Sequence, residues 1–415
     1  MKLSQLFLIF FFLLFTITFN ITDTYAASWY NRNWKYRKKI TIDNTKVSGT
    51  ANFTNFPVLI NRTDADWADT SNSGKVAQSD GGDILFTSSD GITKLDHEIE
   101  KYTNTSGALV VWVEIPTLSY NTDTEIYIYY GNSAGSLDES NATGTWNGNF
   151  AAVWHLSEDP SITTDGDCGG GTKEGCDSTS NNYDWDANGT MTSGDSVDAQ
   201  IGKGIDFDAI DDYLGLGNIL DNDGTAAVSF SAWIKTSGQF LAILSKIQSS
   251  GDFTGQQMRI DSGGLPRLII RKDLSPSDQL IITGSTALND NALHYVVMTY
   301  DGTKAVAGSN IYVDGSAETI GSSTDTFTTS SSNTINFNIA AVNDGANNLF
   351  SGVIDEARVY SGVLSSDWVQ TEFNNQNSPS TFYSVAAQER FRRVLSWRMN
   401  DLPWIGFFVD KYFNK

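Results

Sequence analysis

Two pairs of carboxylates have the residue types and spacing for acid–base chemistry. In HEIEKY (97–102), Glu98 and Glu100 lie on one face of a predicted strand, because side chains alternate along a strand. A retaining glycosidase uses two carboxyl groups about 5 to 5.5 Å apart, which such a pair can supply. The pair lacks the Glu-x-Asp-x-x-Glu spacing of glucanases, and the adjacent Asp355 and Glu356 are expected to point to opposite faces. We therefore expect a protein that is not an enzyme.

A serine nucleophile has a formal motif as well. GNSAG (131–135) matches G-x-S-x-G, the sharp turn that exposes a serine such as Ser133 between a strand and a helix. The residues that follow, SLDESNATG, predict no helix, so the motif lacks the geometry it needs. The three histidines, His97, His155 and His294, lie in or beside predicted strands, and we expect them to be structural.

Oxygen ligands for a hard cation occur in a glycine-containing loop. The segment DWDANGTMTSGD (184–195) has the spacing of an EF-hand loop at Asp184, Asp186, Asn188, Gly189 and Asp195. No helices are predicted on either side, and the twelfth position is Asp rather than Glu. The pattern therefore argues against an EF-hand and leaves a non-helical calcium loop as the alternative.

The two cysteines lie close together in CGGGTKEGC (168–176). A disulfide between Cys168 and Cys176 would stiffen a glycine-rich loop. The alternative is a zinc site, but there is no C-x-x-C motif and no neighbouring histidine to complete one. We predict the disulfide.

Aromatic side chains in predicted loops could stack on the apolar faces of sugars. Trp185 and Tyr183 are the first candidates for such a ligand site, and Tyr213 and Trp146 also lie in or beside loops. Three other tryptophans lie within predicted strands and are expected in the core: Trp112, Trp154 and Trp233.

The composition limits the partners. The 415 residues carry a net charge of −22, which argues against nucleic acid and against a coat on anionic membranes. Charged residues are only 18%, while glycine is abundant and proline is scarce. This composition suits short strands joined by polar turns.

The N-terminal segment predicts export. Residues 1–27 contain one Lys, an apolar run from Leu6 to Phe19 and the small pair Ala26 and Ala27, which is typical of a signal peptide. The alternative, an uncleaved membrane anchor, would need about 20 apolar residues, more than this run has. We expect the mature protein to be secreted or at the cell surface.

The remaining chain predicts an all-β protein with two β-sandwich domains in tandem. Short alternating strands fill residues 29–132, a polar linker spans 133–145, and a second and larger set of strands fills 146–389. Within the second set, TFYSVAAQE (381–389) is expected to close the sandwich, and only Ser365 to Phe373 predicts a helix, capped by Ser365 or Ser366.

The C-terminal tail, residues 390–415, differs from the body. Six basic residues outnumber two acidic ones among several tryptophans and phenylalanines. The tail could dock on its own acidic domain, lie at a membrane interface or bind a partner. Membrane contact is expected only through this segment.

Three motifs in order carry a first family resemblance. WKYRKKITIDNTKVSGTANFTNFPVLI, GGDILFTSSDGITKLDHEIEKY and LVVWVEIPTLSYNTDTEIYIYYGN resemble the domain-of-unknown-function family numbered 2341 over about residues 29–132. The family has no established activity. The resemblance implies a secreted β-sandwich that often precedes a lectin-like domain.

A second set of motifs carries a second resemblance. VWHLSED, DSTSNN, GIDFDAIDDYLGLG, VSFSAWIK, IYVDG and GVIDEARVYSGVLS resemble a concanavalin A-like jelly roll of the laminin-G-like type. This implies a structural Ca²⁺ near the sandwich edge, and the residues that match its ligands are Asp177, Asn182 (or Asn181), Asp206 (or Asp211) and Asp355. The alternative is that these aspartates cap turns and accept backbone N–H groups.

We predict a secreted, non-catalytic recognition module that binds carbohydrate or a surface polymer through the jelly-roll domain. The alternative is a structural cell-surface or adhesion component, with the sandwiches as spacers and the tail as a docking segment. A third reading is a glycoside hydrolase, since jelly rolls of this type also carry glucanases. Fold alone does not choose among them.

Overall fold

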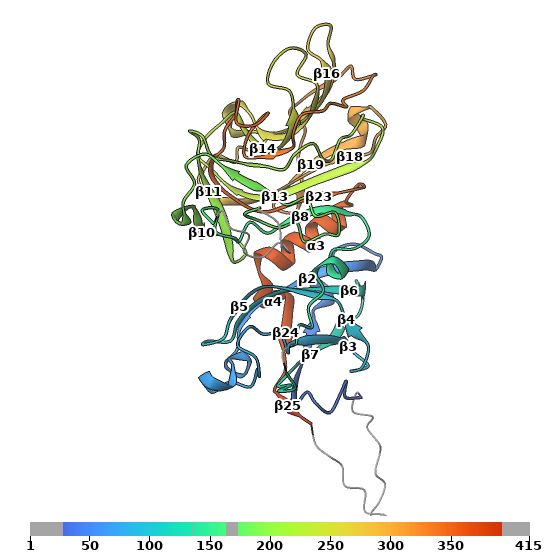
Figure 1. Ribbon diagram of the computed structural model, residues 1–415. Helices are drawn as coiled ribbons and strands as arrows, with labels where there is room; N and C mark the ends of the chain where they lie inside the picture. The colour runs from blue at the N-terminus through green and yellow to red at the C-terminus, as the bar shows by residue number, and fades with distance from the viewer. Residues whose placement is uncertain (1–27, 136, 163–172, 392–415) are drawn as a thin grey trace, which may run out of the picture.

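The computed structural model describes residues 28–135, 137–162 and 173–391. These residues form two β-sandwiches stacked one on the other (Figure 1). The all-β prediction with two sandwiches in tandem is confirmed. The signal segment 1–27, Cys168 and the tail from residue 392 lie outside the described residues, so the signal peptide, the disulfide and the docking role of the tail stay predictions.

The first sandwich packs a six-stranded sheet on a three-stranded one. In the larger sheet the strand order is β24-β1-β7-β3-β4, with β25 also on β1, and in the smaller it is β2-β6-β5. The strands of the N-terminal part are β1 (Tyr36–Ile42), β2 (Phe53–Thr63), β3 (Leu85–Ser88), β4 (Lys94–Leu95), β5 (His97–Thr103), β6 (Ala108–Leu118) and β7 (Thr124–Tyr130).

Two strands of the three-stranded sheet, β2 and β6, are buried on both faces along most of their central residues. In β6, every residue from Leu109 to Ile115 is buried, and in β2 the buried run is Phe56 to Ile60. Strands covered on both sides have continuous apolar runs rather than an alternating pattern. LVVWVEI in β6 is such a run, and its second face lies against the second sandwich.

The second sandwich consists of two eight-stranded sheets. Their orders are β10-β11-β23-β13-β18-β19-β20, with β8 on β23, and β21-β17-β16-β15-β14-β22-β12-β9. Its strands are β8 (Phe150–Trp154), β9 (Asp186–Asn188), β10 (Ser196–Asp198), β11 (Lys203–Asp208), β12 (Tyr213–Gly215), β13 (Val228–Lys235), β14 (Leu241–Ile247), β15 (Gly255–Ile260), β16 (Pro266–Asp273), β17 (Asp278–Thr283), β18 (Leu293–Tyr300), β19 (Ser309–Val313), β20 (Ser316–Ala317), β21 (Ser322–Asp325), β22 (Asn338–Ile339) and β23 (Ser351–Tyr360).

Helices are short apart from one. The α-helices are α2 (Ala142–Thr145), α3 (Ser366–Asn377) and α4 (Pro379–Phe382). The single-turn 3₁₀ helices are η1 (Asn44–Lys46), η2 (Ala65–Trp67), η3 (Thr70–Asn72), η4 (Ser193–Asp195), η5 (Ser262–Gly264) and η6 (Val306–Gly308). Within the described part of the chain, none is long and apolar enough to cross a membrane.

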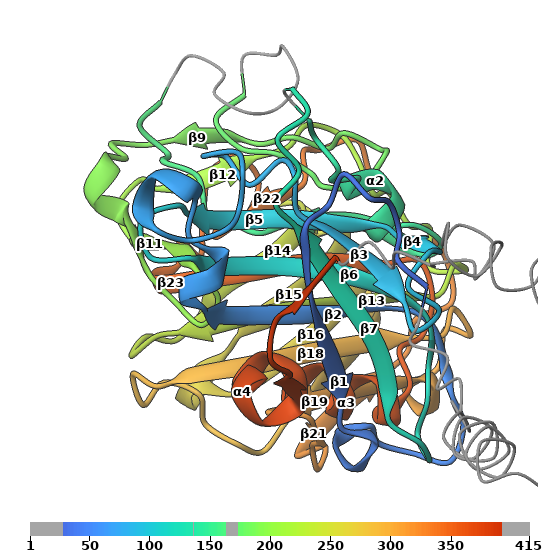
Figure 2. The same ribbon diagram turned by 90° about the horizontal axis from the view of Figure 1, so that it is seen from below.

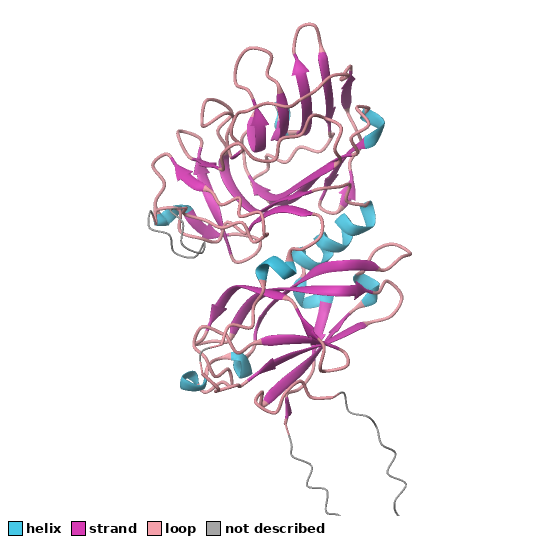
Figure 3. Ribbon diagram, turned by 45° about the vertical axis from the view of Figure 1, so that its right-hand side comes forward, coloured by secondary structure: helices cyan, strands magenta, loops and turns pink. Residues whose placement is uncertain are grey.

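The predicted helix is present as α3 and lies between the two sandwiches (Figure 3). The Ser365 hydroxyl accepts the Trp368 N–H at 3.2 Å, which confirms the predicted cap. On the first-sandwich side, the Asn375 amide bonds both the N–H and the carbonyl of Leu59 on the edge strand β2, at 2.7 and 3.0 Å. On the other side, Gln376 accepts the Trp233 indole N–H at 2.6 Å. The helix therefore joins two sheets that belong to different domains.

The expected closure of the second sandwich by residues 381–389 is wrong. β24 (Tyr383–Val385) and β25 (Glu389–Arg390) return to the first sandwich and pair with β1, with Ile40 opposite Val385. Figure 2 shows the C-terminal segment, in red, running back to the dark-blue N-terminal strand. The pairing satisfies an otherwise open edge of β1, since unpaired strand edges are unfavourable. The first domain is therefore completed by the end of the described chain.

The segment 133–145, predicted as a linker, is also packed against the first sandwich. The Glu139 N–H donates to the carbonyl of Gly82 at 3.2 Å, and the Asn141 N–H donates to the carbonyl of His97 at 2.7 Å. These bonds fix the start of the second domain on the first.

Candidate functional site

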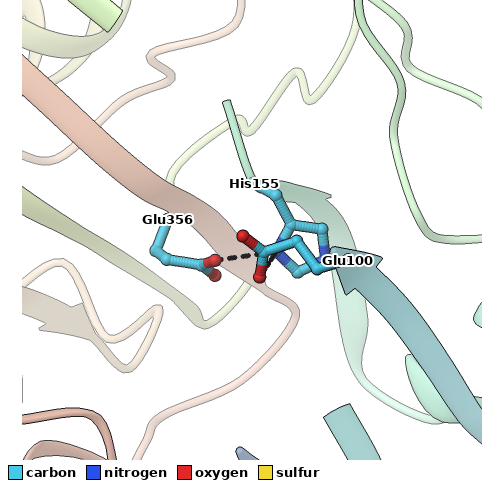
Figure 4. A group of neighbouring side chains, drawn as sticks. All are labelled: Glu100, His155 and Glu356. Atoms are coloured by element: carbon cyan, nitrogen blue, oxygen red, sulfur yellow. Dashed lines mark hydrogen bonds and ion pairs between the residues drawn. The ribbon is translucent and has the colours of Figure 1, made fainter. Parts of the chain in front are cut away.

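A cluster of charged side chains is buried where the two sandwiches meet. We call it the interdomain cluster, and its members are Glu98, Glu100, His155, Asp355, Glu356 and Arg358. The first two come from β5, His155 follows β8, and the last three come from β23. Figure 4 shows the carboxyl groups of Glu100 and Glu356 beside the His155 ring, and both lie near its Nδ1, at 3.7 and 2.8 Å.

His155 is held by carboxylates at both ring nitrogens. Its Nδ1 lies 2.8 Å from Glu356 Oε1, and its Nε2 lies 3.1 Å from Glu98 Oε2. Burial opposes a charge here, but the two carboxylates outweigh it and raise the pKa of His155 well above its ordinary value. Because both nitrogens face acceptors, the ring holds both protons as an imidazolium.

Glu98 is the most accessible carboxylate of the cluster. It accepts hydrogen bonds from the Ser178 hydroxyl at 2.7 Å and from the Trp146 indole N–H. Burial works against ionisation, yet the contact with His155 and these donors keep the pKa of Glu98 below its usual range. Glu98 is therefore an ionised carboxylate of the first sandwich that binds three side chains of the second domain.

Glu100 has the opposite environment. Its side chain is 1% exposed, and only one oxygen is bonded, accepting the Trp112 indole N–H at 3.0 Å. The other oxygen, Oε1, has no hydrogen-bond partner. Burial, reinforced by the charge of Glu356, raises the pKa of Glu100 to about 8. At neutral pH this side chain is a buried neutral acid.

Asp355 and Glu356 do not point to opposite faces as expected. The pairing of β13 with β23 shifts by one residue between Ser231 and Trp233, and Glu356 has φ 52°, so β23 carries a bulge here. Ile354 and Ala357, on either side, both belong to the core of the second sandwich. The two acids between them face the first sandwich, and Asp355 accepts the N–H of Ile201, which lies between β10 and β11 of its own sandwich, at 2.9 Å.

Arg358 supplies a second positive charge. Its guanidinium lies over the rings of Trp112 at 4.4 Å and Trp146 at 4.7 Å. It also pairs with Glu356 at 2.5 Å and with Glu372 of α3 at 3.3 Å. Two cations thus face the ionised carboxylates of the cluster.

Glu100, His155 and Glu356 bring one ligand atom each within 4.8 Å of one another, a spacing that a metal ion could use. The donors do not fit a metal, because a His ligand must offer a free lone pair. Both His155 nitrogens carry a proton toward a carboxylate, and Glu356 is already shared with Arg358. The cluster is an ion-pair network that joins the domains.

A cleft of about 570 Å³, which we call the interdomain cleft, opens beside this cluster. Two predicted calcium ligands, Asp177 and Asn182, line it. Asp177 is already saturated: its carboxylate accepts the backbone N–H groups of Val153, Thr179 and Tyr183 at 3.0 Å each, and the Thr179 hydroxyl at 2.8 Å. This is the turn-capping arrangement named as the alternative. Asp177 holds its loop rather than offering free ligand atoms.

The four predicted calcium ligands are not brought together. Asp206 is exposed on β11 opposite Val353, and Asp355 is buried in the interdomain cluster. Among the described acids, a different group on the second sandwich gathers its oxygens within 4.8 Å, namely Asp208, Asp211 and Asp212.

This acidic group lies beside the predicted calcium loop. The carboxylate of Asp211 accepts the Thr190 N–H at 3.3 Å, and β12 pairs with β9 from that loop. Asp212 is 3% exposed, and its Oδ1 has no partner. Burial and the charge of Asp208 raise the pKa of Asp212 to about 6. An all-oxygen donor set with one free buried oxygen fits Ca²⁺.

Trp185 is not a sugar-stacking residue. Its side chain is 0% exposed and belongs to the core of the second sandwich, so the prediction is wrong. Tyr183 is half-buried against the same core, and its carbonyl accepts the Trp154 indole N–H at 2.7 Å. Trp185 lies in a segment whose sequence predicts a loop, but its ring fills the core beneath it.

Cys176, one of the two cysteines of the predicted disulfide, lines the interdomain cleft.

A second cleft, of about 410 Å³, lies on the outer face of the second sandwich, over β14, β15 and β16. We call it the outer cleft. In Figure 1, β14 and β16 lie at the end of the molecule far from the first sandwich. Its lining is polar with an apolar floor and consists of Ile247, Gln248, Ser249, Phe253, Gln257, Arg259, Arg267, Ile269, Arg271, Val342, Asn347 and Asn348.

Strand register places the outer-cleft side chains on one face. Gln257 is opposite Ile269, and Arg259 is opposite Arg267. Directly opposed residues of an antiparallel pair share a face. The sequence carries part of this signal, because RLIIR (267–271) has basic residues four positions apart within the region of predicted strands.

Family models match two parts of the chain. Residues 80–156 match the Domain of unknown function (DUF2341), and residues 208–370 match the Concanavalin A-like lectin/glucanases superfamily. Both resemblances, and their order, are confirmed. The first match includes Glu98, Glu100 and His155, and the second includes Glu356, so the interdomain cluster draws on both. No curated protein matches the chain in sequence.

Solved structures show distant similarity. The binding domain of Paraclostridial Mosquitocidal Protein 1 is 13% identical with a TM-score of 0.41, and 54% of this chain aligns with 52% of that one. The botulinum neurotoxin serotype G binding domain is 15% identical with a TM-score of 0.38, over 54% and 50%. The chain thus spans about half the length of both. Domain 4 of AbnA, an extracellular GH43 arabinanase from Geobacillus stearothermophilus, is 17% identical with a TM-score of 0.37, over 55% and 100%.

Proposed function

We propose that the protein is a non-catalytic recognition module that binds carbohydrate or a surface polymer in the outer cleft. The observation that carries the proposal is the cleft itself. It lies on the face of the second sandwich that is turned away from the first, and it combines hydrogen-bonding side chains with an apolar floor. Binding sites for small ligands have this composition.

The lining suits sugar hydroxyls. Amide groups of Gln257, Asn347 and Asn348 both donate and accept hydrogen bonds, as a hydroxyl does. Ile269 and the ring of Phe253 provide apolar surface for the C–H face of a sugar ring. The match to a superfamily of lectins and glucanases supports the same ligand class.

The absence of acids from this cleft supports binding without catalysis. Among the described residues, no Asp or Glu lines it, whereas glycoside hydrolysis needs a pair of carboxyl groups across the scissile bond. A ligand held there meets neither a general acid nor a carboxylate nucleophile.

A glycan array probed with the full-length protein tests this proposal. The variant Asn347→Ala should weaken binding of the glycans that the wild type retains. A matched control is Asn149→Ala, because Asn149 contacts Tyr360 on another part of the surface. Equal binding by wild type and Asn347→Ala, or binding that follows Asn149 instead, would place the ligand elsewhere and contradict the proposal.

A glycoside hydrolase is the second candidate, and one observation favours it. Glu98 and Glu100 line the interdomain cleft with pKa values displaced in opposite directions, as in an acid–base pair. Against it, the Glu100 side chain is buried and Glu98 is shared with His155. Release of reducing ends from polysaccharide that stops in Glu98→Gln would favour the enzyme.

We also propose that Ca²⁺ binds at Asp208, Asp211 and Asp212 rather than at the set predicted from the sequence. The free buried oxygen of Asp212 supports this. The signal-like segment 1–27 supports secretion or a place at the cell surface.

A further inference from the structure

The outer cleft is basic on a strongly acidic protein. In the part of the chain that the structure describes, three arginines line it and no carboxylate does, although the chain carries a net charge of −22. One acid lies just beyond the lining: Asp261 contacts Arg259 at 3.1 Å and Arg267 at 2.5 Å. A single carboxylate therefore faces two guanidinium groups.

Arg271 has no ion-pair partner among the described residues. Its Nε donates to the side-chain oxygen of Gln279 at 2.7 Å, a neutral acceptor. The charges that act on it most are those of Arg259 and Arg267, which add to the burial that lowers the pKa of Arg271. Positive charge is thus concentrated at this end of the cleft without compensation.

Hydrogen-bond donors in the same cleft are unpartnered. Gln257 is 2% exposed, yet its amide Nε2 has no hydrogen-bond partner among residues 28–135, 137–162 and 173–391, and neither does the Nε of Arg259. A buried donor without an acceptor lowers the stability of the folded protein, and a bound acceptor would remove that cost. The unpartnered donors and the positive charge therefore favour the same kind of ligand group, one that accepts hydrogen bonds and is negatively charged.

The register separates two cationic ends by an apolar floor. Arg267 and Arg271 are four residues apart on β16, so their Cα atoms are about 13 Å apart, and Ile269 lies between them on the same face. A point anion such as phosphate would use one end only. A longer ligand that carries acid groups and apolar ring faces would use both.

We propose that the outer cleft binds an acidic saccharide and that it recognises the carboxylate groups of this ligand. The assignment rests on the proposed glycan-binding function. The planar guanidinium of Arg271 matches a carboxylate in two-point hydrogen bonding. The Gln257 amide donates a further hydrogen bond, and Ile269 supports the sugar ring. The ligand class is a polymer or oligomer of uronic or similar carboxylated sugars.

Titration calorimetry on the full-length protein tests the inference with four probes: polygalacturonate, dextran sulfate, neutral dextran and inorganic phosphate. We expect polygalacturonate to bind, with an affinity that falls as salt rises. Arg271→Gln should weaken it about 10- to 100-fold, the loss of one charge-assisted contact. Arg62→Gln changes the net charge equally, and it should leave binding unchanged because Arg62 lies on β2 of the first sandwich. Gln257→Leu, which keeps the charge, should also weaken binding.

The outcomes separate this inference from the proposed function. Binding to neutral glycans alone would overturn the acidic assignment and leave the recognition module intact. Binding to dextran sulfate or phosphate without polygalacturonate would overturn the carboxylate assignment. If no glycan binds and none changes the unfolding temperature, both the acidic-saccharide assignment and the proposed recognition function are contradicted. Equal affinities for wild type and Arg271→Gln would place the acid-binding site elsewhere.

Discussion

Replacing Glu100 by Gln should make the protein more stable, and more so as pH rises. The substitution keeps the shape of the side chain, and the amide oxygen can still accept the Trp112 indole N–H. In the folded protein the carboxyl is neutral at pH 6, because burial and the charge of Glu356 raise its pKa to about 8. In the unfolded chain the same group ionises near its ordinary value of 4.5.

The direction in which the free energy of unfolding changes with pH follows from the number of protons bound in the folded and unfolded states. Between these two pKa values the folded state holds a proton that the unfolded state has released, so the free energy of unfolding falls as pH rises. At about 1.36 kcal/mol per pKa unit, wild type loses ~2 kcal/mol by pH 6 and ~5 kcal/mol by pH 9 through this group. The Glu100→Gln variant has no such group and keeps that stability.

Urea unfolding at pH 4, 6 and 9 measures the difference. We expect wild type and Glu100→Gln to agree at pH 4 and to diverge steadily above it. The matched control is Glu125→Gln on β7, which removes a half-exposed partner of Lys39 and should change stability by less than ~1 kcal/mol at any pH. Parallel pH profiles for wild type and Glu100→Gln would refute a neutral Glu100 and, with it, the proposed charge state of the cluster.

Three further predictions concern the domains, the core and the metal. Deleting residues 383–391 removes β24 and β25 from β1, and both sandwiches should then lose stability in one calorimetric transition, since α3 and a shared core join them. Trp185→Ala should destabilise the protein by about 3 to 5 kcal/mol in urea unfolding while the folded protein still binds its glycan, because the ring is core. Calcium should raise the unfolding temperature of wild type but not of Asp212→Asn; an equal rise in both would exclude this site.

The strands can be predicted from the sequence, but the contact between the two domains cannot. Alternation and turn residues are local signals, so the strands of both sandwiches and the α3 cap at Ser365 could be predicted. The return of Tyr383 to β1 could not, because a lone strand does not encode which edge it pairs with. The prediction that Asp355 and Glu356 point to opposite faces is wrong for a different reason. A bulge adds one residue to the strand and reverses the alternation of side chains beyond it.

The candidate sites show the same division. Trp185 was misplaced because a loop segment can direct a ring into the core, and no periodicity reports that. Asp177 could be read as a ligand or a turn cap, and its four hydrogen bonds decide for the cap. The arginines of the outer cleft lie on two strands, β15 and β16, and they meet on one face only when these strands pair in register.

The two charged regions have different physical consequences. In the interdomain cluster, each cation faces carboxylates at short distance and the group is buried, so removing one partner would leave an unpaired buried charge at a cost of about 3 to 5 kcal/mol. Such a network fixes the relation of the two sandwiches. In the outer cleft, Arg271 lacks an acidic partner among the described residues and Gln257 lacks an acceptor for Nε2. Unbalanced charge and unsatisfied donors persist in a folded protein at some cost in stability, and a ligand that supplies the missing acceptors recovers that cost as affinity. The rigid junction then holds the outer cleft at the end of the molecule, where a polymer can reach it.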